Sequence, residues 1–244
     1  YVEVTAGNNG HTRYPVILVH GFAGWDEIMG IEYFYGVKDY MLEQGYDVYT
    51  PATMPVASIE TRSALLMQYL HELTSGPVHL VGHSQGGLDS RFVAAHPAMA
   101  GRIATVTTVS SPHRGTPIAD MALGLLPGWS EAALGFFVEV LGWEYAVFQQ
   151  LSEAHMAAFN RTVTDKVQVS YRSYSFVSDP LGFTGDVIGP YFWLSWYLID
   201  KVEGPNDGLV PASSAVWGEH RGELPADRCS RFSNIRGMEK SGPL

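Results

Sequence analysis

Hydrophobic and polar positions follow two different patterns along the chain. Short, continuous apolar runs rich in β-branched residues are typical of strands buried on both faces of a parallel sheet. We expect such a strand at residues 15–19 and another in the apolar, β-branched run at 77–81. We expect further strands at 47–50 and 103–109, and a strand with alternating polarity at residues 167–174.

Between these runs, apolar residues recur every three or four positions, which is the spacing of one helix face. One stripe lies within residues 34–41 and ends at Gly45, a second lies within 65–73 and ends at Gly76, and a third follows the 77–81 run and ends at Pro97. Strand and helix therefore alternate, which predicts an α/β fold whose mostly parallel sheet carries helices on both faces. We expect a single domain over residues 1–244.

The apolar run at 77–81 leads directly into Gly82-His83-Ser84-Gln85-Gly86. A strand, a G-x-S-x-G turn and a helix in that order are the sequence form of a nucleophile elbow. Glycines on either side of the serine allow strand and helix to approach closely, because they lack a Cβ atom. Ser84 is therefore the candidate nucleophile, whereas the motif without its flanking elements would be a glycine-rich loop.

The first apolar run ends in His20-Gly21-Phe22-Ala23-Gly24. In an α/β-hydrolase the oxyanion hole takes one backbone amide from this loop and one from the residue after the nucleophile. Phe22 and Gln85 are therefore the oxyanion candidates.

A serine nucleophile needs an acid and a base. In this fold the acid follows the serine along the chain, and the base follows the acid. Asp207 lies in a turn that could hold a carboxylate toward the pocket, whereas Asp179 precedes a proline and is typical of a turn or cap. One histidine, His220, follows Asp207. His113 precedes both acids, so we expect it to have a structural or rim role.

Residues 120–148 have a different composition. They contain many large apolar residues, a few glutamates and no lysine or arginine. We expect a helical insertion over residues 119–150 that acts as a mobile lid with an apolar face; a buried helical insertion is the alternative.

The charge composition argues against some classes of binding partner. The formal charge is −10 with only 15 Lys and Arg residues, which argues against nucleic acid and anionic membrane surfaces. The longest apolar run, residues 187–199, is too short for a membrane span and contains Pro190. The chain starts at Tyr1; removal of a signal peptide would explain this, and so would a shortened chain.

Five segments resemble the secreted bacterial triacylglycerol lipases of the Pseudomonas and Burkholderia type. They are YPVILVHGFAG at 14–24, GIEYFYGV at 30–37, GHSQGG with SRFVAA at 82–95, SPHRGTPIAD at 111–120 and NDGLV at 206–210. The resemblance extends from Tyr14 to Trp217. It implies an α/β-hydrolase fold with a lid after Asp120, interfacial hydrolysis of acyl esters, Ser84 as nucleophile, Asp207 as acid, and oxyanion amides from Phe22 and Gln85.

The resemblance ends before the C-terminus. In such lipases the histidine base lies in an Asp-His-Leu-Asp-like segment, and here the corresponding residues are Ala226-Asp227-Arg228-Cys229-Ser230. Arg228 stands at the histidine position, and Ser230 stands where a carboxylate helps to bind a structural calcium ion. Asp186 could still be a calcium ligand. The disulfide of the family cannot form, because Cys229 is the single cysteine.

Three explanations of the missing histidine remain open. His220 could act as the base from a shifted loop, the tail could be altered so that the native base is absent, or the protein could have lost hydrolytic function. An arginine cannot be the base, because it stays protonated. Among the residues present, we take His220 as the candidate.

The sequence predicts a serine hydrolase that cleaves carboxylic esters, and specifically a triacylglycerol lipase acting on long-chain acyl glycerols at a lipid–water interface. The alternatives are a catalytically impaired, lipase-like binding protein and an esterase for shorter, soluble esters. The predicted chemistry needs no metal or other cofactor. We also expect a secreted monomer, and a dedicated folding chaperone as in many relatives.

Overall fold

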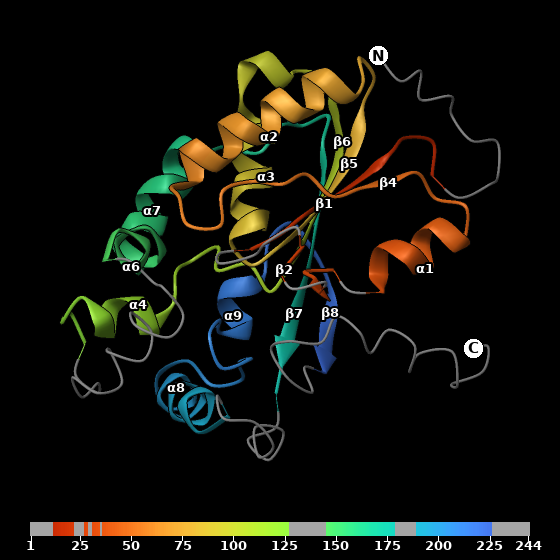
Figure 1. The fold of residues 1–244 in the computed structure, drawn as a ribbon. Coiled ribbons are helices and arrows are strands. Elements are labelled where there is room, and N and C mark those ends of the chain that lie inside the picture. The colour runs from red at the N-terminus through yellow and green to blue at the C-terminus, as the bar shows by residue number, and fades with distance from the viewer. Residues whose placement is uncertain are drawn as a thin grey trace.

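A computed structural model describes residues 12–21, 27–28, 31–34, 36–126, 145–178 and 189–225 of the chain. Its centre is a six-stranded sheet in the order β4-β1-β5-β6-β7-β8, and each neighbouring pair of strands is parallel (Figure 1). The strands are β1 (Val16–Val19), β4 (Val48–Tyr49), β5 (Val78–His83), β6 (Ile103–Val109), β7 (Ser170–Val177) and β8 (Glu219–Pro225). Two short strands, β2 (Glu27–Ile28) and β3 (Ile31–Glu32), pair with each other in antiparallel orientation.

Helices cover both faces of this sheet, as the sequence pattern predicts. One face packs against α2 (Ile59–Leu73) and α3 (Gln85–Ala95), and the other packs against α1 (Val37–Glu43) (Figure 1). Successive side chains of a strand point to opposite faces, so Ile17 lies in the same buried cluster as Leu66, and Leu18 lies in the cluster that contains Val37. Both faces of β1 are therefore buried, which explains its continuous apolar sequence.

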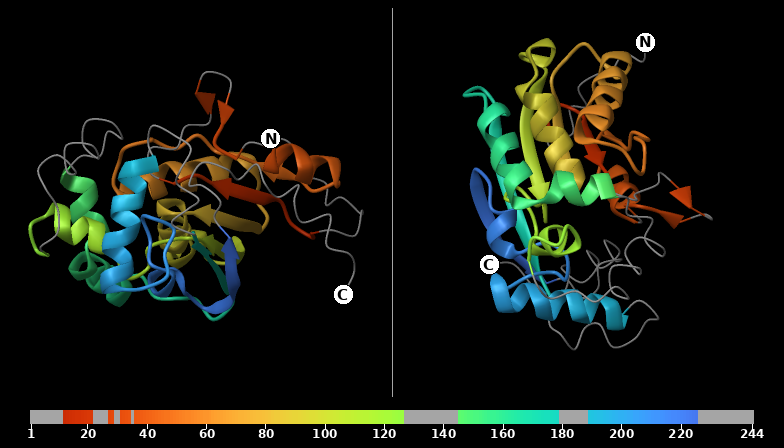
Figure 2. Two further views of the ribbon diagram at one scale, coloured as in Figure 1. Left: turned by 90° about the horizontal axis from the view of Figure 1, so that it is seen from below. Right: turned by 90° about the vertical axis from the view of Figure 1, so that its left-hand side faces the viewer.

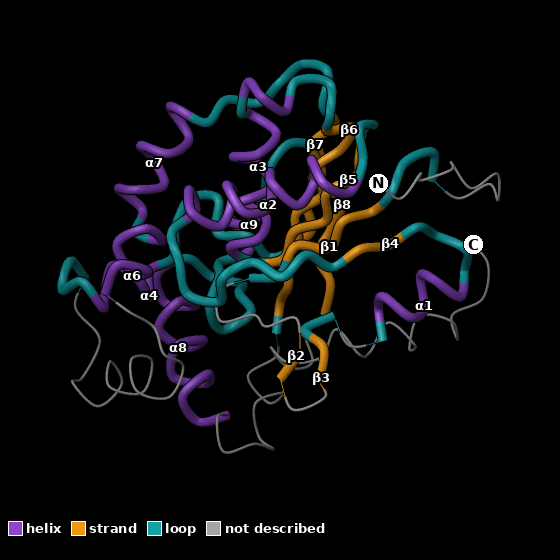
Figure 3. The backbone as a smooth tube through the Cα atoms, turned by 45° about the horizontal axis from the view of Figure 1, so that its top comes forward, coloured by secondary structure: helices purple, strands orange, loops and turns teal. Residues whose placement is uncertain are grey.

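The remaining helices lie beside the sheet. They are the short 3-10 helix η1 (Pro97–Met99), α4 (Pro117–Ala122), α6 (Tyr145–Leu151), α7 (Glu153–Thr162), α8 (Gly189–Val202) and α9 (Ala212–Ala215). A third buried cluster joins α4, α6, α7 and α8 to α2 and α3 through Ile59, Leu88, Ile118, Phe148, Met156 and Ile199. Figure 3 shows α7, α6, α4 and α8 following one another along one side of the molecule, and Figure 2 shows α8 at one end of the sheet.

The predicted lid lies between two described helices. Ile118 and Ala119 of α4 pack against Val147 and Phe148 of α6, so both ends of the 119–150 segment belong to the core. Residues 127–144 lie outside the described part of the chain, and the lid therefore stays a prediction. Over the described ranges, no helix combines the length and the apolar character that a membrane crossing requires.

Strand β8 is the one strand of the large sheet that the sequence pattern did not predict. Its residues are mostly polar and largely exposed, and it forms an edge of the sheet beside β7. An edge strand has one solvated side and needs no apolar run. This strand decides where His220 lies.

Candidate active site

Ser84 occupies the sharp turn between β5 and α3. Its backbone has φ 52° and ψ −126°, a conformation that non-glycine residues seldom adopt and that the surrounding structure must enforce. The turn is held because the Ser84 amide donates to the carbonyl of Val109 on β6 at 2.9 Å. The predicted elbow is therefore present in the backbone, at the carboxyl end of the sheet.

The glycines of the elbow are required by close backbone contacts. A Cβ atom at Gly82 would lie 2.4 Å from the carbonyl oxygen of Gly86, and one at Gly86 would lie 2.2 Å from the carbonyl oxygen of Val19. Real Cβ atoms do not approach other atoms so closely, so any side chain would push α3 away from β5 and β1. The G-x-S-x-G spacing thus serves the packing of strand, turn and helix.

The loop after β1 lies against the nucleophile. A Cβ atom at Gly21 would lie 2.9 Å from Cβ of Ser84 and 3.2 Å from the carbonyl oxygen of His83. Phe22, the oxyanion candidate that follows Gly21, lies outside the described residues. The described part of the loop, which ends at Gly21, nevertheless lies against Ser84, as an oxyanion loop must.

Gln85, the second oxyanion candidate, is the first residue of α3 and is buried. The first amides of a helix have no acceptor within the helix and carry the positive end of its dipole. The side chain of Gln85 donates from Nε2 to the carbonyl of Ala57 at 3.0 Å. Its backbone amide is therefore held at the helix start, next to Ser84, where an oxyanion would form.

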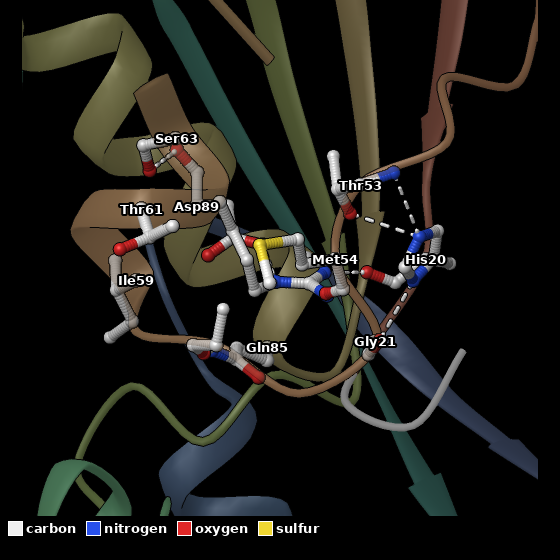
Figure 4. A network of polar contacts seen from close by, with 12 residues as sticks. His20, Gly21, Thr53, Met54, Ile59, Thr61, Ser63, Gln85 and Asp89 are labelled. Atoms are coloured by element: carbon white, nitrogen blue, oxygen red, sulfur yellow. Dashed lines mark hydrogen bonds and ion pairs between the residues drawn. The ribbon is translucent and has the colours of Figure 1, made fainter. Parts of the chain in front are cut away.

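Arg62 anchors the β1 loop, and sequence reasoning missed this role. Its guanidinium donates from Nη2 to the carbonyl of His20 at 2.5 Å and from Nη1 to the carbonyl of Met54 at 2.6 Å, and Nε lies 2.7 Å from Oδ2 of Asp89. The His20 ring faces Thr53, with Nε2 2.9 Å from the hydroxyl oxygen (Figure 4). One signal in the sequence could have indicated this role. Arg62 lies four positions before Leu66 and eight before Leu70, so it shares the buried face of the same helix.

His83 and Tyr33 form a second contact beside the nucleophile. Nδ1 of His83 lies 2.5 Å from the Tyr33 hydroxyl. Burial lowers the pKa of His83 to about 4, so its imidazole is neutral near pH 7. A Cβ atom at Gly21 would also lie 2.8 Å from the Tyr33 hydroxyl oxygen, which places this hydroxyl at the same loop.

Asp207, the acid candidate, is buried, and both oxygens of its carboxylate accept hydrogen bonds. Oδ1 accepts from the amides of Leu209 at 2.9 Å and Val210 at 2.8 Å, and Oδ2 accepts a short hydrogen bond from the Ser110 hydroxyl. Burial raises the pKa of Asp207, and these hydrogen bonds act in the opposite direction. The carboxylate is thus held in one orientation.

The turn that carries Asp207 lies at the carboxyl ends of the strands, as the elbow does. The amide of Ser178, directly after β7, donates to the carbonyl of Asn206 at 2.9 Å. Ser110, which binds Asp207, directly follows Val109, the acceptor of the Ser84 amide. The structure therefore brings the predicted nucleophile and the predicted acid to strand ends on either side of β6, the end of β5 for Ser84 and the end of β7 for the Asp207 turn.

The structure does not bring His220 to Ser84. In the sheet, Gly82 pairs with Thr108, Thr108 with Ser173, and Ser173 with His220. Three strand spacings of about 4.8 Å place His220 about 14 Å from Gly82, and Ser84 lies two residues further along β5. The exposed ring of His220 instead has Nδ1 3.2 Å from the Ser173 hydroxyl. The reason is that β8 begins at Glu219, so His220 is the second residue of this edge strand and lies far from the carboxyl ends of the strands, where Ser84 lies.

His113 lies in the interior, in agreement with the structural role expected from its chain order. Nδ1 lies 3.3 Å from the Arg91 guanidinium, and Nε2 lies 2.9 Å from the Thr108 hydroxyl oxygen. Because arginine can only donate, Nδ1 accepts and Nε2 carries the proton. Burial, together with Arg91 and Arg114, lowers the pKa of His113 well below its usual value, so this imidazole stays neutral.

The remaining predicted site residues lie outside the described ranges. They are Asp179, Asp186, Arg228, Cys229 and Ser230. Within those ranges, no group of three or more His, Cys, Asp or Glu residues could hold a metal ion. Since the candidate calcium ligands fall elsewhere, calcium binding stays a prediction.

Comparisons with known proteins agree with this geometry. The family described as PGAP1-like alpha/beta domain matches residues 59–125. Among solved structures, a Bacillus licheniformis lipase in its mature form aligns with TM-score 0.70 and 20% identity over 92% of this chain and 89% of that one. A metagenomic carboxyl esterase aligns with TM-score 0.72 and 21% identity over 92% of this chain and 65% of that one. These matches show the α/β-hydrolase fold.

Two relatives are similar along almost their whole length. A triacylglycerol lipase of Burkholderia plantarii is 34% identical over 99% of this chain and 86% of the relative. A triacylglycerol lipase of Pseudarthrobacter phenanthrenivorans is 35% identical over 96% of this chain and 93% of the relative. Together with the elbow and the acid turn, this similarity shows that the chain belongs to the triacylglycerol lipase family of ester-hydrolysing enzymes.

Proposed function

We propose that this chain hydrolyses triacylglycerols by nucleophilic catalysis at Ser84. The observation that carries the proposal is the hydrogen-bonded link between the elbow and the acid turn: the Ser84 amide binds the carbonyl of Val109, and the hydroxyl of the next residue, Ser110, binds the Asp207 carboxylate. In this mechanism the Ser84 oxygen attacks the ester carbonyl and forms a bond to its carbon. The amides of Phe22 and Gln85 stabilise the oxyanion, the proton of the Ser84 hydroxyl passes through a base to the alcohol as its bond to the acyl carbon breaks, and water then releases the fatty acid.

The first experiment tests the nucleophile and the substrate class. We expect hydrolysis of an emulsified long-chain triacylglycerol to exceed hydrolysis of a soluble short-chain ester. Ser84→Ala should lower both rates, and the loss should reach a factor of at least about 10³ where a histidine base serves the nucleophile, because only binding and the oxyanion hole then remain. A serine-directed phosphonate should label Ser84 in the unaltered chain and leave Ser84→Ala unlabelled. Equal rates in the two proteins would refute the assignment of Ser84.

We propose that the base belongs in the segment after β8, at the position of Arg228. Pro225, the last residue of β8, pairs with Val177 of β7, next to Ser178 and the Asp207 turn. The chain therefore leaves β8 one strand away from the acid, whereas His220 lies several residues earlier on the edge. The resemblance to bacterial lipases supports the same position, because their histidine aligns with Arg228.

This proposal is tested by two substitutions made in parallel. Arg228→His should raise the rate of ester hydrolysis about 10²–10⁴-fold, the usual contribution of a general acid–base group. His220→Ala should leave the rate unchanged. The opposite pattern, in which His220→Ala abolishes activity and Arg228→His has no effect, would assign the base to His220.

A second candidate function is lipid binding without turnover. It is favoured by the position of His220 away from Ser84 and by Arg228 at the histidine position. This function predicts that the unaltered chain retains a fatty-acid ester in equilibrium dialysis but releases no fatty acid over a long incubation. Release of fatty acid that is lost in Ser84→Ala would exclude it.

The biological setting is proposed from the family alone. The relatives imply a lipid or ester substrate. We propose that the protein is secreted, that it acts as a monomer at a lipid–water interface beneath a lid, and that a dedicated chaperone assists its folding. Refolding of the purified chain from urea without other proteins would contradict the need for a chaperone.

A further inference from the structure

Two serines in the described part of the chain have a positive φ angle. They are Ser84, with φ 52°, and Ser110, with φ 46°. Serine rarely adopts this conformation, and such residues persist only where their surroundings hold them. The elbow accounts for the conformation of Ser84. The conformation of Ser110 calls for a separate explanation.

Ser110 joins two strands to the acid turn. It is 1% exposed, directly follows β6, and its amide donates to the carbonyl of Tyr174 on β7 at 2.9 Å. Its hydroxyl donates to Oδ2 of Asp207, which is itself 5% exposed. The strained backbone therefore turns the hydroxyl toward the carboxylate.

Ser110 differs from two further donors to this carboxylate among the described residues. Leu209 and Val210 belong to the same turn as Asp207 and bind Oδ1 with their amides. They fix the shape of the turn but cannot fix its position relative to the sheet. Ser110 is the donor among these three that comes from the end of β6, directly after the residue that binds the Ser84 amide.

The neighbouring serine provides a natural comparison. Ser111 is also fully buried, yet within the described residues its hydroxyl has no hydrogen-bond partner. Burial of a serine at this strand end therefore does not by itself produce a bond to the acid. The contact depends on the backbone conformation of Ser110.

We propose that Ser110 is a positioning residue for the reaction, and that its hydroxyl fixes the Asp207 carboxylate to the end of β6 beside Ser84. This inference rests on the proposed function in one respect, the assignment of Asp207 as the acid. A hydroxyl donated to a carboxylate favours the ionised form. Ser110 therefore also opposes the effect of burial, which raises the pKa of Asp207.

The test uses Ser110→Gly and Ser110→Ala in the full chain, with Ser111→Ala as the matched control. Glycine adopts φ near 46° without strain, so Ser110→Gly removes the hydroxyl and preserves the backbone. Alanine removes the hydroxyl and retains the strain. An effect shared by both variants is due to the hydroxyl.

The primary measurement is the pKa of Asp207 from a ¹³C NMR titration of its carboxyl group, with the resonance assigned by Asp207→Asn. Loss of the Ser110 bond should raise this pKa by about one unit in both Ser110 variants. It should not change in Ser111→Ala. An unchanged pKa in Ser110→Gly would overturn the proposal.

The second measurement is the rate at which a phosphonate labels Ser84, as a function of pH. In the Arg228→His chain, where a histidine can couple Asp207 to Ser84, the acidic limb of this profile should shift in the Ser110 variants and not in Ser111→Ala, whereas a purely structural role would lower the rate equally at every pH. A pKa change without a shift of the limb would also overturn the positioning role. The titration needs no turnover, so it decides for or against the Ser110 bond even if Ser84 proves unreactive and the proposed function fails.

Discussion

Arg62 and Asp89 form a fully buried ion pair, with 2.7 Å between Nε and Oδ2. Arg62 also binds the carbonyls of His20 and Met54, so the pair connects α2 and α3 to the loop beside Ser84. Burial raises the pKa of Asp89 to about 7, and the charge and hydrogen bond of Arg62 act against this rise.

Arg62→Met should therefore lower the free energy of unfolding by about 3–5 kcal/mol, because it leaves a buried carboxylate and two carbonyls without their donor. Urea denaturation at pH 7 measures this. Arg62→Met combined with Asp89→Leu should recover only part of the loss, since the carbonyls of His20 and Met54 remain unpaired. Full recovery would show that the carbonyl contacts contribute nothing.

Gly86 should not tolerate a methyl group. A Cβ atom there would lie 2.2 Å from the carbonyl oxygen of Val19 and 2.5 Å from that of His20. We expect Gly86→Ala to lower the free energy of unfolding by more than about 3 kcal/mol or to prevent folding, because the obstacle is backbone. Gly76→Ala is the control, since among the described residues its Cβ atom would meet the Thr74 hydroxyl alone, at 3.6 Å. Similar thermal midpoints for the two variants would contradict the proposed packing.

His113 should make the protein less stable in acid. Its folded-state pKa lies well below the ordinary value, so over the interval between the two values the unfolded chain binds a proton that the folded chain does not. Stability due to this group is complete above about pH 6.5 and falls as the pH decreases, by at most about 1.4 kcal/mol per pH unit. His83, whose pKa is also lowered, contributes with the same sign.

Urea denaturation between about pH 7 and pH 5 measures this dependence. In His113→Gln the slope of the unfolding free energy against pH should decrease, because one buried neutral imidazole has been removed. It should not vanish, because His83 remains. An identical slope in both proteins would show that His113 is protonated equally in the folded and unfolded states.

Trp217 should be important for stability although it is only partly buried. The Arg91 guanidinium carbon lies 3.4 Å from the centre of its ring, and its Nε1 donates to Asp165 Oδ2 at 3.0 Å. We expect Trp217→Leu to lower the free energy of unfolding by about 2–4 kcal/mol. Trp193, which is 46% exposed, is the control, and Trp193→Leu should change stability by less than about 0.5 kcal/mol. Equal effects would mean that the Arg91 contact adds no stability.

Much of the fold was predictable because its signals are local. The run at 15–19 is apolar because both faces of β1 are covered, the β-branched residues at 103–109 form the interior strand β6, and the stripe at 65–73 marks the buried side of α2. The elbow was predictable for a similar reason. Gly82 has close backbone neighbours four and five residues later, and Gly86 has them at the end of the adjacent strand β1. A short sequence motif therefore indicates where glycine is required.

The edge of the sheet was not predictable in the same way. The residues from Glu219 to Pro225 show neither a continuous apolar run nor regular alternation with a buried face, because one side of β8 is solvated. The choice of His220 as base followed chain order alone. Its position depends on the pairing of β8 with β7, which is a long-range contact.

The sequence by itself determined the alternation of strand and helix, the elbow around Ser84 and the carboxylate turn at Asp207, because each depends on residues close together in the chain. The tertiary structure alone decided which side chains meet across the sheet ends. It brought Ser110 to Asp207 and Arg62 to the carbonyl of His20, and it placed His220 three strands from the elbow strand. The physical reason is that strand order and register join residues that lie far apart in sequence, and no local pattern encodes them.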